Sequence, residues 1–293
     1  MRKHNATITG GFWQVWQQTN AERAIFHQWD QLEASGCIDN FRILAQGKGG
    51  FRQGWYFADS DAYKWLEAAS ATLPGYPNPR LTEKVESFIL LIQGAQAHDG
   101  YLYTYNQIHY PGTRWVNLQI EHELYCHGHL IEAGVTHAEC LGEDRLLALA
   151  QKAADRIVFD FMDKGPCFTP GHQEIEIALL RLYELTGKAD YLEMGRAFLA
   201  RRGRMPFFAP HLLRNYISNN RRVAQVEQEK TTYQAAHPDH QVPPLPPSNP
   251  AKQQPGIGLR FMWNALSGKF FQQHQPLKKQ TKPVGHAVRF AYL

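Results

Sequence analysis

The separation of apolar and polar residues is clearest in residues 115–141, which we expect to form one amphipathic helix. His122, Cys126 and His129 fall on one stripe of this helix. A surface helix usually carries Lys and Glu there, so the stripe predicts a helix that lines a shielded polar cavity. Histidines packed in a second layer would give the same pattern, and the stretch alone does not separate the two interpretations. The opposite, apolar stripe consists of Ile120, Leu124, Ile131, Val135 and Ala138.

Shorter segments with helical periodicity predict three further helices, at about residues 17–35, 59–73 and 81–97. Ser35-Gly36 is a typical C-terminal stop for the first of them. The glycine-rich residues 37–59 that follow are expected to form a loop. Its GKGG sequence lacks the spacing and the Ser or Thr of a phosphate-binding loop.

An internal repeat suggests how these helices are arranged. Residues 138–147 (AECLGEDRLL) and 183–192 (YELTGKADYL) each contain a helix end, a glycine and the start of a new helix. Gly142 and Gly187 are expected to adopt the left-handed conformation that ends a helix. No convincing strand lies between the helices, so the sequence predicts an all-α fold of repeated αα-hairpins. Such hairpins either stack as an open solenoid or close into a toroid, and the His/Cys stripe favours closure.

The character of the chain changes after Gly203, and we expect three parts. Residues 1–204 carry the hairpins. Residues 205–271 form a divergent insert whose Pro- and Gln-rich stretch, 237–256, is expected to be extended or disordered. Residues 272–293 end in KPVGHAVRFAYL, which has the features of a new helix start.

Composition excludes several classes of function. The net charge of +4 over 293 residues is small and scattered, so a nucleic-acid partner is not expected. The first residues have no apolar core of signal-peptide length, and no stretch is apolar enough to span a bilayer, which favours a soluble, cytoplasmic protein. Four cysteines without CxxC pairing indicate neither a disulfide framework nor a local zinc knuckle. The oligomeric state is not indicated.

Two segments carry candidate chemistry. HELYCHGH (122–129) invites comparison with the HExxH zinc helix, but the second ligand position holds Cys126, and His129 is seven residues after His122. A metal-dependent hydrolase built on these three residues is therefore disfavoured. The second segment places His172 at a predicted helix start beside Glu174 and Glu176, where either a neutral hydrogen-bonding imidazole or an ordinary capped helix is consistent with the pattern.

Seven motifs in order resemble one family of enzymes. GGFW, IDNFR, YFADSDAYKWLEAA, DGYL, HELYCHGHLIEA, GHQEIEIALLRLYELTG and GHAVR are together similar to glycoside hydrolase family 127, the β-L-arabinofuranosidase type. The resemblance covers about residues 7–204 and 272–293. It implies an (α/α)6 toroid, here incomplete, and an enzyme that removes non-reducing-end β-L-arabinofuranose with retention of configuration from an arabinose-containing saccharide or glycoconjugate.

The resemblance also implies site residues. The family's sugar-contacting histidines correspond to His122, His172 and His286. Its nucleophile is a zinc-bound cysteine and its acid/base a glutamate, in motifs that follow GHAVR and are not found in this sequence. We therefore expect no catalytic residue, no metal ligand and no cofactor here, although zinc serves the full-length family. The chain is expected to be a truncated and inactive hydrolase, or alternatively a non-catalytic remnant that binds a sugar or a partner.

Overall fold

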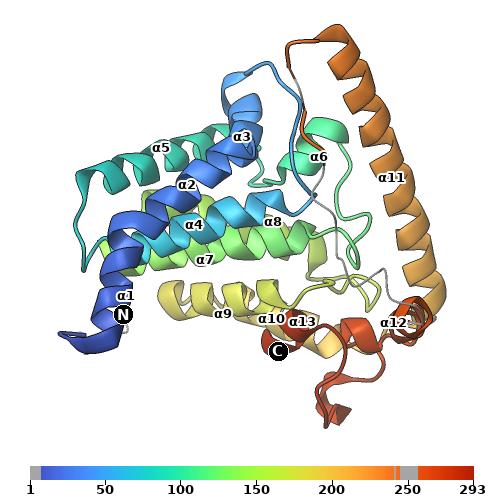
Figure 1. Cartoon of the computed structure of the whole chain (residues 1–293). Helices are drawn as coiled ribbons and strands as arrows, with labels where there is room; N and C mark the ends of the chain where they lie inside the picture. The colour runs from blue at the N-terminus through green and yellow to red at the C-terminus, as the bar shows by residue number, and fades with distance from the viewer. Residues whose placement is uncertain (1–7, 241, 245–256) are drawn as a thin grey trace.

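The computed structural model describes residues 8–240, 242–244 and 257–293, and within them every regular element is helical (Figure 1). The prediction of an all-α fold is confirmed. The helices in chain order are α1 (Gly11–Thr19), a π-helical turn η1 (Asn20–Ala24), α2 (Ile25–Ala34), α3 (Cys37–Gln46), α4 (Ala58–Thr72), α5 (Pro79–Ala95), α6 (Thr104–His109), α7 (Glu123–Leu141), α8 (Arg145–Phe161), α9 (Glu174–Thr186), α10 (Ala189–Arg201), α11 (Phe208–Ala236), α12 (Ile257–Leu266), the 3₁₀ turns η3 (Lys269–Phe271) and η4 (Leu277–Lys279), and α13 (Ala287–Ala291).

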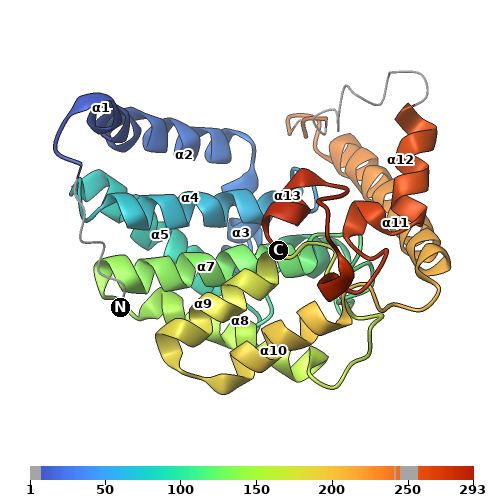
Figure 2. The same ribbon diagram turned by 90° about the horizontal axis from the view of Figure 1, so that it is seen from below.

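Three αα-hairpins form the centre of the fold. They are α4–α5, α7–α8 and α9–α10, and the first helix of each packs against its counterpart in the next, so that α7 lies between α4 and α9 (Figure 2). The second helices, α5, α8 and α10, form an outer layer with fewer mutual contacts. This two-layered arc is part of an α/α toroid, the one of the two arrangements left open by the repeat that the His/Cys stripe favoured.

The ends of these helices follow from local sequence. Gly142 and Gly187 end α7 and α9 in the left-handed region, with φ of 71° and 72°, as the repeat predicted. Asn78 begins α5 by accepting a hydrogen bond from the backbone N–H of Arg80 at 3.0 Å, and Pro79 occupies the first helical position. The hairpin turns are therefore specified by a few capping residues.

The predicted helix over residues 115–141 is wrong at its start. Residues 115–122 are irregular, and α7 begins only at Glu123. Trp115 has a positive φ of 63°, and its backbone N–H donates to the Glu123 carboxylate at 2.8 Å. The periodic pattern of apolar residues did not reveal this turn, because the turn is held by a hydrogen bond between a backbone N–H and a side chain.

The expected division of α7 into one packed stripe and one stripe that lines a polar cavity is also wrong. One side of α7, including Cys126 and Leu130, belongs to a core shared with α4 and α5. The other side, including Leu124 and Ile131, belongs to a core shared with α8, α9 and α10. Because α7 is the middle inner helix, both of its sides are covered.

Helices occur in two segments where the sequence predicted none. Residues 37–59 contain α3, whose Ile38 and Phe41 are fully buried, so the predicted loop is wrong over its first half. Residues 205–271 contain α11 and α12, which the composition of the following Pro/Gln-rich stretch obscured. Most of that stretch, residues 241 and 245–256, lies outside the described residues.

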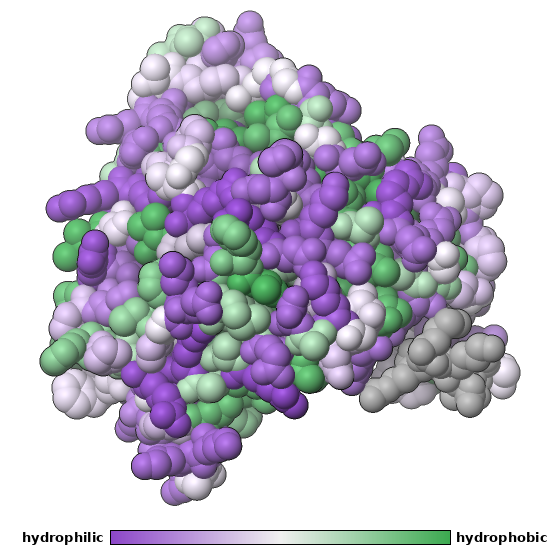
Figure 3. Space-filling model, turned by 180° about the vertical axis from the view of Figure 1, so that it is seen from behind, coloured by the Kyte–Doolittle hydropathy of each residue, from purple (hydrophilic) through white to green (hydrophobic). Residues whose placement is uncertain are grey.

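Exposed apolar side chains are found on α1 and α12, where Trp13 is 66% and Trp263 70% exposed. On the face seen in Figure 3, hydrophobic residues form separate patches among hydrophilic ones. Among the described helices, none combines the length and the apolar character needed to cross a membrane.

Candidate functional site

Side chains from four segments meet where the inner helices begin. His122 directly precedes α7, His172 lies just before α9, and His286 directly precedes α13, which crosses these helix starts (Figure 2). The ring centroids of His122 and His172 are 4.5 Å apart, and those of His172 and His286 are 5.6 Å apart. We call these three residues the histidine cluster. Tyr56, which lies before α4, packs against it with its ring 5.3 Å from that of His122.

Glycines directly before two of these histidines allow close backbone approach. A Cβ atom on Gly171 would lie 2.6 Å from the Gln119 carbonyl oxygen, and one on Gly285 would lie 2.2 Å from the Lys269 carbonyl oxygen. Gly285 also has a φ of 79°, which L side chains rarely adopt. The two Gly-His pairs are therefore positions where the chain needs glycine to place the next side chain.

Hydrogen bonds assign the protons on two of the rings. Nδ1 of His122 lies 2.9 Å from the Ile120 carbonyl oxygen, which can only accept, so Nδ1 carries the proton and Nε2 is an acceptor. Nδ1 of His286 accepts from the Arg289 backbone N–H at 3.4 Å, so its Nε2 is a donor. Nδ1 of His172 is buried without a partner among the described residues. The cluster thus offers both a donor and an acceptor.

The imidazoles of the cluster are neutral at ordinary pH. Burial lowers the pKa of His122 to about 3, with Arg289 contributing in the same direction. Burial, followed by the neighbouring His122 and Arg289, lowers the pKa of His172 still further. The pKa of His286 is also lowered by burial and Arg289. Neutral rings suit hydrogen bonding to uncharged hydroxyl groups.

Arg289 is a residue of this site that sequence reasoning did not assign. It is only 4% exposed, its guanidinium lies 4.4 Å from the Phe271 ring centroid, and its Nε and Nη1 have no partner among the described residues. Burial lowers its pKa to about 9, and nearby Arg202 adds to the effect. The GHAVR motif contains it, but nothing in the sequence shows that its charge is buried beside the three histidines of the cluster.

A second group of side chains adjoins the cluster. The Tyr125 ring lies 4.8 Å from that of His172 and 4.5 Å from that of His129. Nδ1 of His129 is 3.2 Å from Glu174 Oε1, but the pair is not aligned as a hydrogen bond, and both atoms are unpartnered. Burial, with Glu132 as the next cause, raises the pKa of Glu174 to about 8. Glu174 is therefore largely protonated at neutral pH, next to a neutral imidazole.

Cys126 does not belong to this site. It is fully buried in the core between α7, α4 and α5, and burial raises the pKa of its thiol well above the usual range. The expected stripe of His122, Cys126 and His129 therefore does not face one cavity. The group of potential metal ligands found among the described residues includes none of these three side chains.

The structure brings together all three histidines that the sequence singled out, although they lie in distant segments. Glu174 and Glu176, also singled out, separate: Glu174 faces His129, whereas the Glu176 carboxylate is 2.9 Å from Nη2 of the buried Arg202. Tyr125 and Arg289 were missed. Tyr125 reaches His172 because α7 packs against α9, and Arg289 reaches the cluster because α13 docks beside it. No local pattern in the sequence shows either contact.

Comparison with known proteins identifies the family of the chain. The sequence profile described as "Beta-L-arabinofuranosidase, GH127 catalytic domain" matches residues 5–292. The chain belongs to glycoside hydrolase family 127. A non-reducing end β-L-arabinofuranosidase from Bifidobacterium longum subsp. longum is 32% identical over 99% of this chain and 42% of its own length.

Two solved structures of family 127 resemble this one. The crystal structure of a β-L-arabinofuranosidase from Geobacillus stearothermophilus T6 is 34% identical, with a TM-score of 0.76 over 98% of this chain and 40% of that one. A family 127 β-arabinofuranosidase is 32% identical, with a TM-score of 0.63 over 70% of this chain and 34% of that one. The chain spans about two fifths of the length of the curated relative that it matches.

The zinc that the family resemblance implies does not fit the described residues beside the histidine cluster. The resemblance implies a zinc ion that is held with cysteine ligands. Cys126 and Cys37 are buried in the core, and burial raises the pKa of both thiols. These two thiols are therefore poorly suited to bind a metal ion beside the cluster.

Proposed function

We propose that the histidine cluster binds the terminal β-L-arabinofuranose unit of an arabinose-containing saccharide. The observation that carries this proposal is the convergence of three neutral imidazoles, with centroid separations of 4.5 and 5.6 Å. A furanose hydroxyl can both donate and accept a hydrogen bond. Nε2 of His122 is available to accept and Nε2 of His286 to donate, so the two ends of the cluster complement such a ring of hydroxyls.

We further propose that this polypeptide by itself binds the saccharide without hydrolysing it. Retaining hydrolysis needs a nucleophile and an acid on either side of the glycosidic bond. Glu176 is engaged by Arg202, and the thiol nearest the cluster in sequence, Cys126, is enclosed in the core. Glu174, with a pKa raised to about 8, could act as an acid, but a nucleophile is not paired with it among the described residues.

The experiment combines binding and turnover with one ligand. A nitrophenyl β-L-arabinofuranoside is titrated against the chain by NMR, and release of nitrophenol is followed in parallel. We expect saturable binding, roughly in the millimolar range for a single sugar. His122→Ala and His172→Ala should each weaken it about fivefold, since one hydrogen bond contributes roughly 1 kcal/mol.

His98→Ala is the matched control because His98 is exposed in the turn after α5, away from the cluster. It should bind like the parent chain. Equal binding by all three variants would contradict the site assignment. Turnover of the glycoside by the purified chain would contradict the proposal that it only binds, without affecting the assignment of the histidines.

We also propose a cytoplasmic location. Its support is that Cys37, Cys126, Cys140 and Cys167 are all free thiols, as expected in a reducing compartment. Fractionation of cells that produce the natural protein tests it, and recovery in the extracellular fraction would contradict it.

A further inference from the structure

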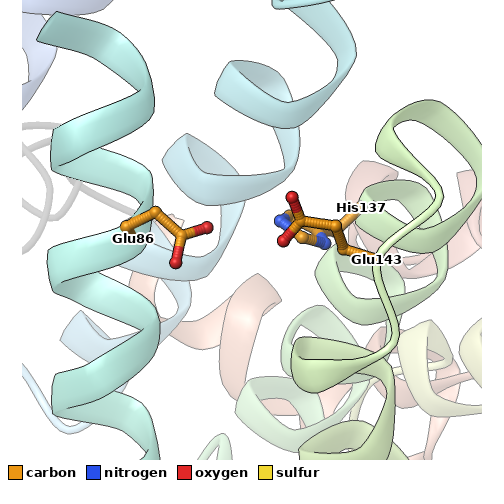
Figure 4. Close-up of side chains that lie close together, drawn as sticks. All are labelled: Glu86, His137 and Glu143. Atoms are coloured by element: carbon orange, nitrogen blue, oxygen red, sulfur yellow. The ribbon is translucent and has the colours of Figure 1, made fainter. Parts of the chain in front are cut away.

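A second cluster of potential ligands lies at the far end of α7. It consists of Glu86 in α5, His137 in the last turns of α7 and Glu143 in the turn between α7 and α8. Each offers one ligand atom, and the three atoms lie within 4.8 Å of one another. Figure 4 shows the Glu86 carboxylate directed toward the other two side chains. No metal ligand was predicted from the sequence, and these three residues form no motif along the chain.

His137 distinguishes this cluster from ordinary surface acids. Its side chain is fully buried, and neither ring nitrogen has a hydrogen-bond partner among the described residues. A buried polar group without a partner typically costs about 1–3 kcal/mol. Native structures rarely leave such groups unsatisfied, so an unpartnered imidazole beside two carboxylates indicates a ligand.

We propose that Glu86, His137 and Glu143 bind a divalent transition-metal ion, with Zn²⁺ preferred. One imidazole and two carboxylates are a three-ligand set that Zn²⁺ accepts in tetrahedral geometry, with water at the fourth position. An imidazole ligand disfavours Mg²⁺ and Ca²⁺, which take oxygen ligands. Bond lengths of about 2.1 Å place tetrahedral ligand atoms roughly 3.4 Å apart. The carboxylates of Glu86 and Glu143, half-buried and exposed, have the freedom to close that gap.

Arg145 competes with the metal ion for one ligand. Its Nη2 donates a hydrogen bond to Oε2 of Glu86, and the two side chains form an ion pair. The other carboxylate oxygen is therefore available. A metal ion at the cluster would compete with the guanidinium for the charge of Glu86, so removing Arg145 should strengthen metal binding.

The position of the cluster assigns the metal ion a structural role. Glu86 belongs to the α4–α5 hairpin, whereas His137 and Glu143 belong to α7–α8, and the outer helices of these hairpins contact each other sparsely. An open depression of about 590 Å³, lined by Glu86 and Glu143, separates them at this point. A bound ion would link two neighbouring hairpins of the toroid across it.

This site is separate from the histidine cluster. His122 precedes the first turn of α7, whereas His137 lies fifteen residues later, which is about 22 Å along a helix at 1.5 Å per residue. The proposed ion also has no thiolate ligand, unlike the zinc that the family resemblance implies. Its role does not depend on the proposed saccharide function.

The test measures zinc binding to the purified, chelator-treated chain by isothermal titration calorimetry and elemental analysis. We expect one Zn²⁺ per chain and no comparable binding of Mg²⁺. Saturating Zn²⁺ should raise the midpoint of thermal unfolding by roughly 5 °C, because an ion that binds only the folded state stabilises it.

Five variants locate the ion. Glu86→Gln and Glu143→Gln should each weaken zinc binding at least about tenfold, since each removes an anionic ligand. Arg145→Ala should tighten it. Glu193→Gln, which removes the same charge from an exposed position on α10, should leave zinc binding unchanged. His122→Ala should also retain the ion.

Failure of the parent chain to bind zinc would overturn the proposal. So would undiminished binding in both Glu86→Gln and Glu143→Gln, or loss of binding in His122→Ala, which would place the ion at the histidine cluster. Glutamine has nearly the same volume as glutamate, and both positions are half-buried or exposed, so we expect Glu86→Gln and Glu143→Gln to fold. Circular dichroism checks their folding before the titration.

Discussion

The imidazoles of His122 and His172 lie 4.5 Å apart, centroid to centroid, at the starts of two adjacent inner helices. Both rings are held neutral because burial and the nearby Arg289 disfavour their protonated forms. A pair of uncharged, partly accessible imidazoles binds hydroxyl groups better than it moves protons at neutral pH. This is the physical basis for assigning the cluster to saccharide binding.

Gly285→Ala should disrupt the cluster from the backbone. Its Cβ would meet the Lys269 carbonyl oxygen at 2.2 Å, at a φ of 79°. We expect a loss of roughly 2 kcal/mol or more in the free energy of unfolding, together with weakened saccharide binding as His286 shifts. Denaturant unfolding and ligand titration measure the two effects.

Gly142→Ala is the control for that substitution. Gly142 has a similar φ of 71°, but a Cβ there meets no atom within 4 Å. The substitution should lower the free energy of unfolding by about 1 kcal/mol and leave saccharide binding intact. If both variants bind the saccharide equally, His286 is not positioned by its glycine.

Glu174→Gln should change how stability depends on pH. Burial raises the pKa of Glu174 from 4.5 to about 8, so the folded chain retains a proton that the unfolded chain releases. Stability from this group is complete below about pH 4.5 and falls as pH rises toward 8, by at most about 1.4 kcal/mol per pH unit. The midpoint temperature of thermal unfolding should therefore fall less steeply between pH 6.5 and 8 for Glu174→Gln than for the parent chain.

Glu184→Gln is the matched control for this titration. Glu184 lies on the same helix, α9, but is exposed. Its substitution should leave the pH dependence as it is in the parent chain. An unchanged profile for Glu174→Gln would show that the carboxyl is ionised in the folded protein.

Cys126→Ser should destabilise the fold without affecting saccharide binding. The thiol is fully buried in an apolar core, and a hydroxyl there lacks a good partner, so we expect a loss of about 1–3 kcal/mol. Cys167→Ser, at a partly exposed position, should change stability by less than about 0.5 kcal/mol. Thiol reagents should label Cys167 well before Cys126; rapid labelling of Cys126 would place it at an accessible site instead.

Arg289→Met should separate binding from folding. Methionine preserves an apolar stem against Phe270 and Phe271 but removes a buried charge with unpartnered N–H groups. We expect stability within about 1 kcal/mol of the parent chain and roughly tenfold weaker saccharide binding. The exposed Arg204→Met is the control. Strong destabilisation with unchanged affinity would mean that Arg289 only supports the fold.

Local signals in the sequence predicted much of the arc but not its irregular parts. The helices near residues 59–73 and 81–97 and the ends at Gly142 and Gly187 follow from periodicity and capping, which are properties of neighbouring residues. Residues 37–46 were predicted as a loop because the glycines after them dominate the pattern. Their helix is stabilised by burying Ile38 and Phe41 against distant helices.

The sequence identified the three histidines of the site but not the side chains that surround them. The three histidines were identified through family motifs, whereas the inward orientation of Cys126 and the burial of Arg289 depend on tertiary packing. The Glu86–His137–Glu143 cluster had no sequence signal, since its members come from two hairpins and a turn. A single sequence does not reveal clusters of side chains that come together only when hairpins pack against each other.

The segment that carries His286 is attached to the helical arc by few contacts. Gln272 accepts a hydrogen bond from Gln173 at 3.0 Å, Gln273 accepts from the backbone N–H of Gly203 at 2.7 Å, and the adjoining apolar cluster around Phe271 is small. Segments with few buried contacts open at lower free energy than the core. The cluster is complete only in molecules whose tail is docked, so the measured affinity equals the intrinsic affinity multiplied by the docked fraction. Saccharide binding and tail closure are then thermodynamically linked, and the ligand should slow amide hydrogen exchange in residues 286–291.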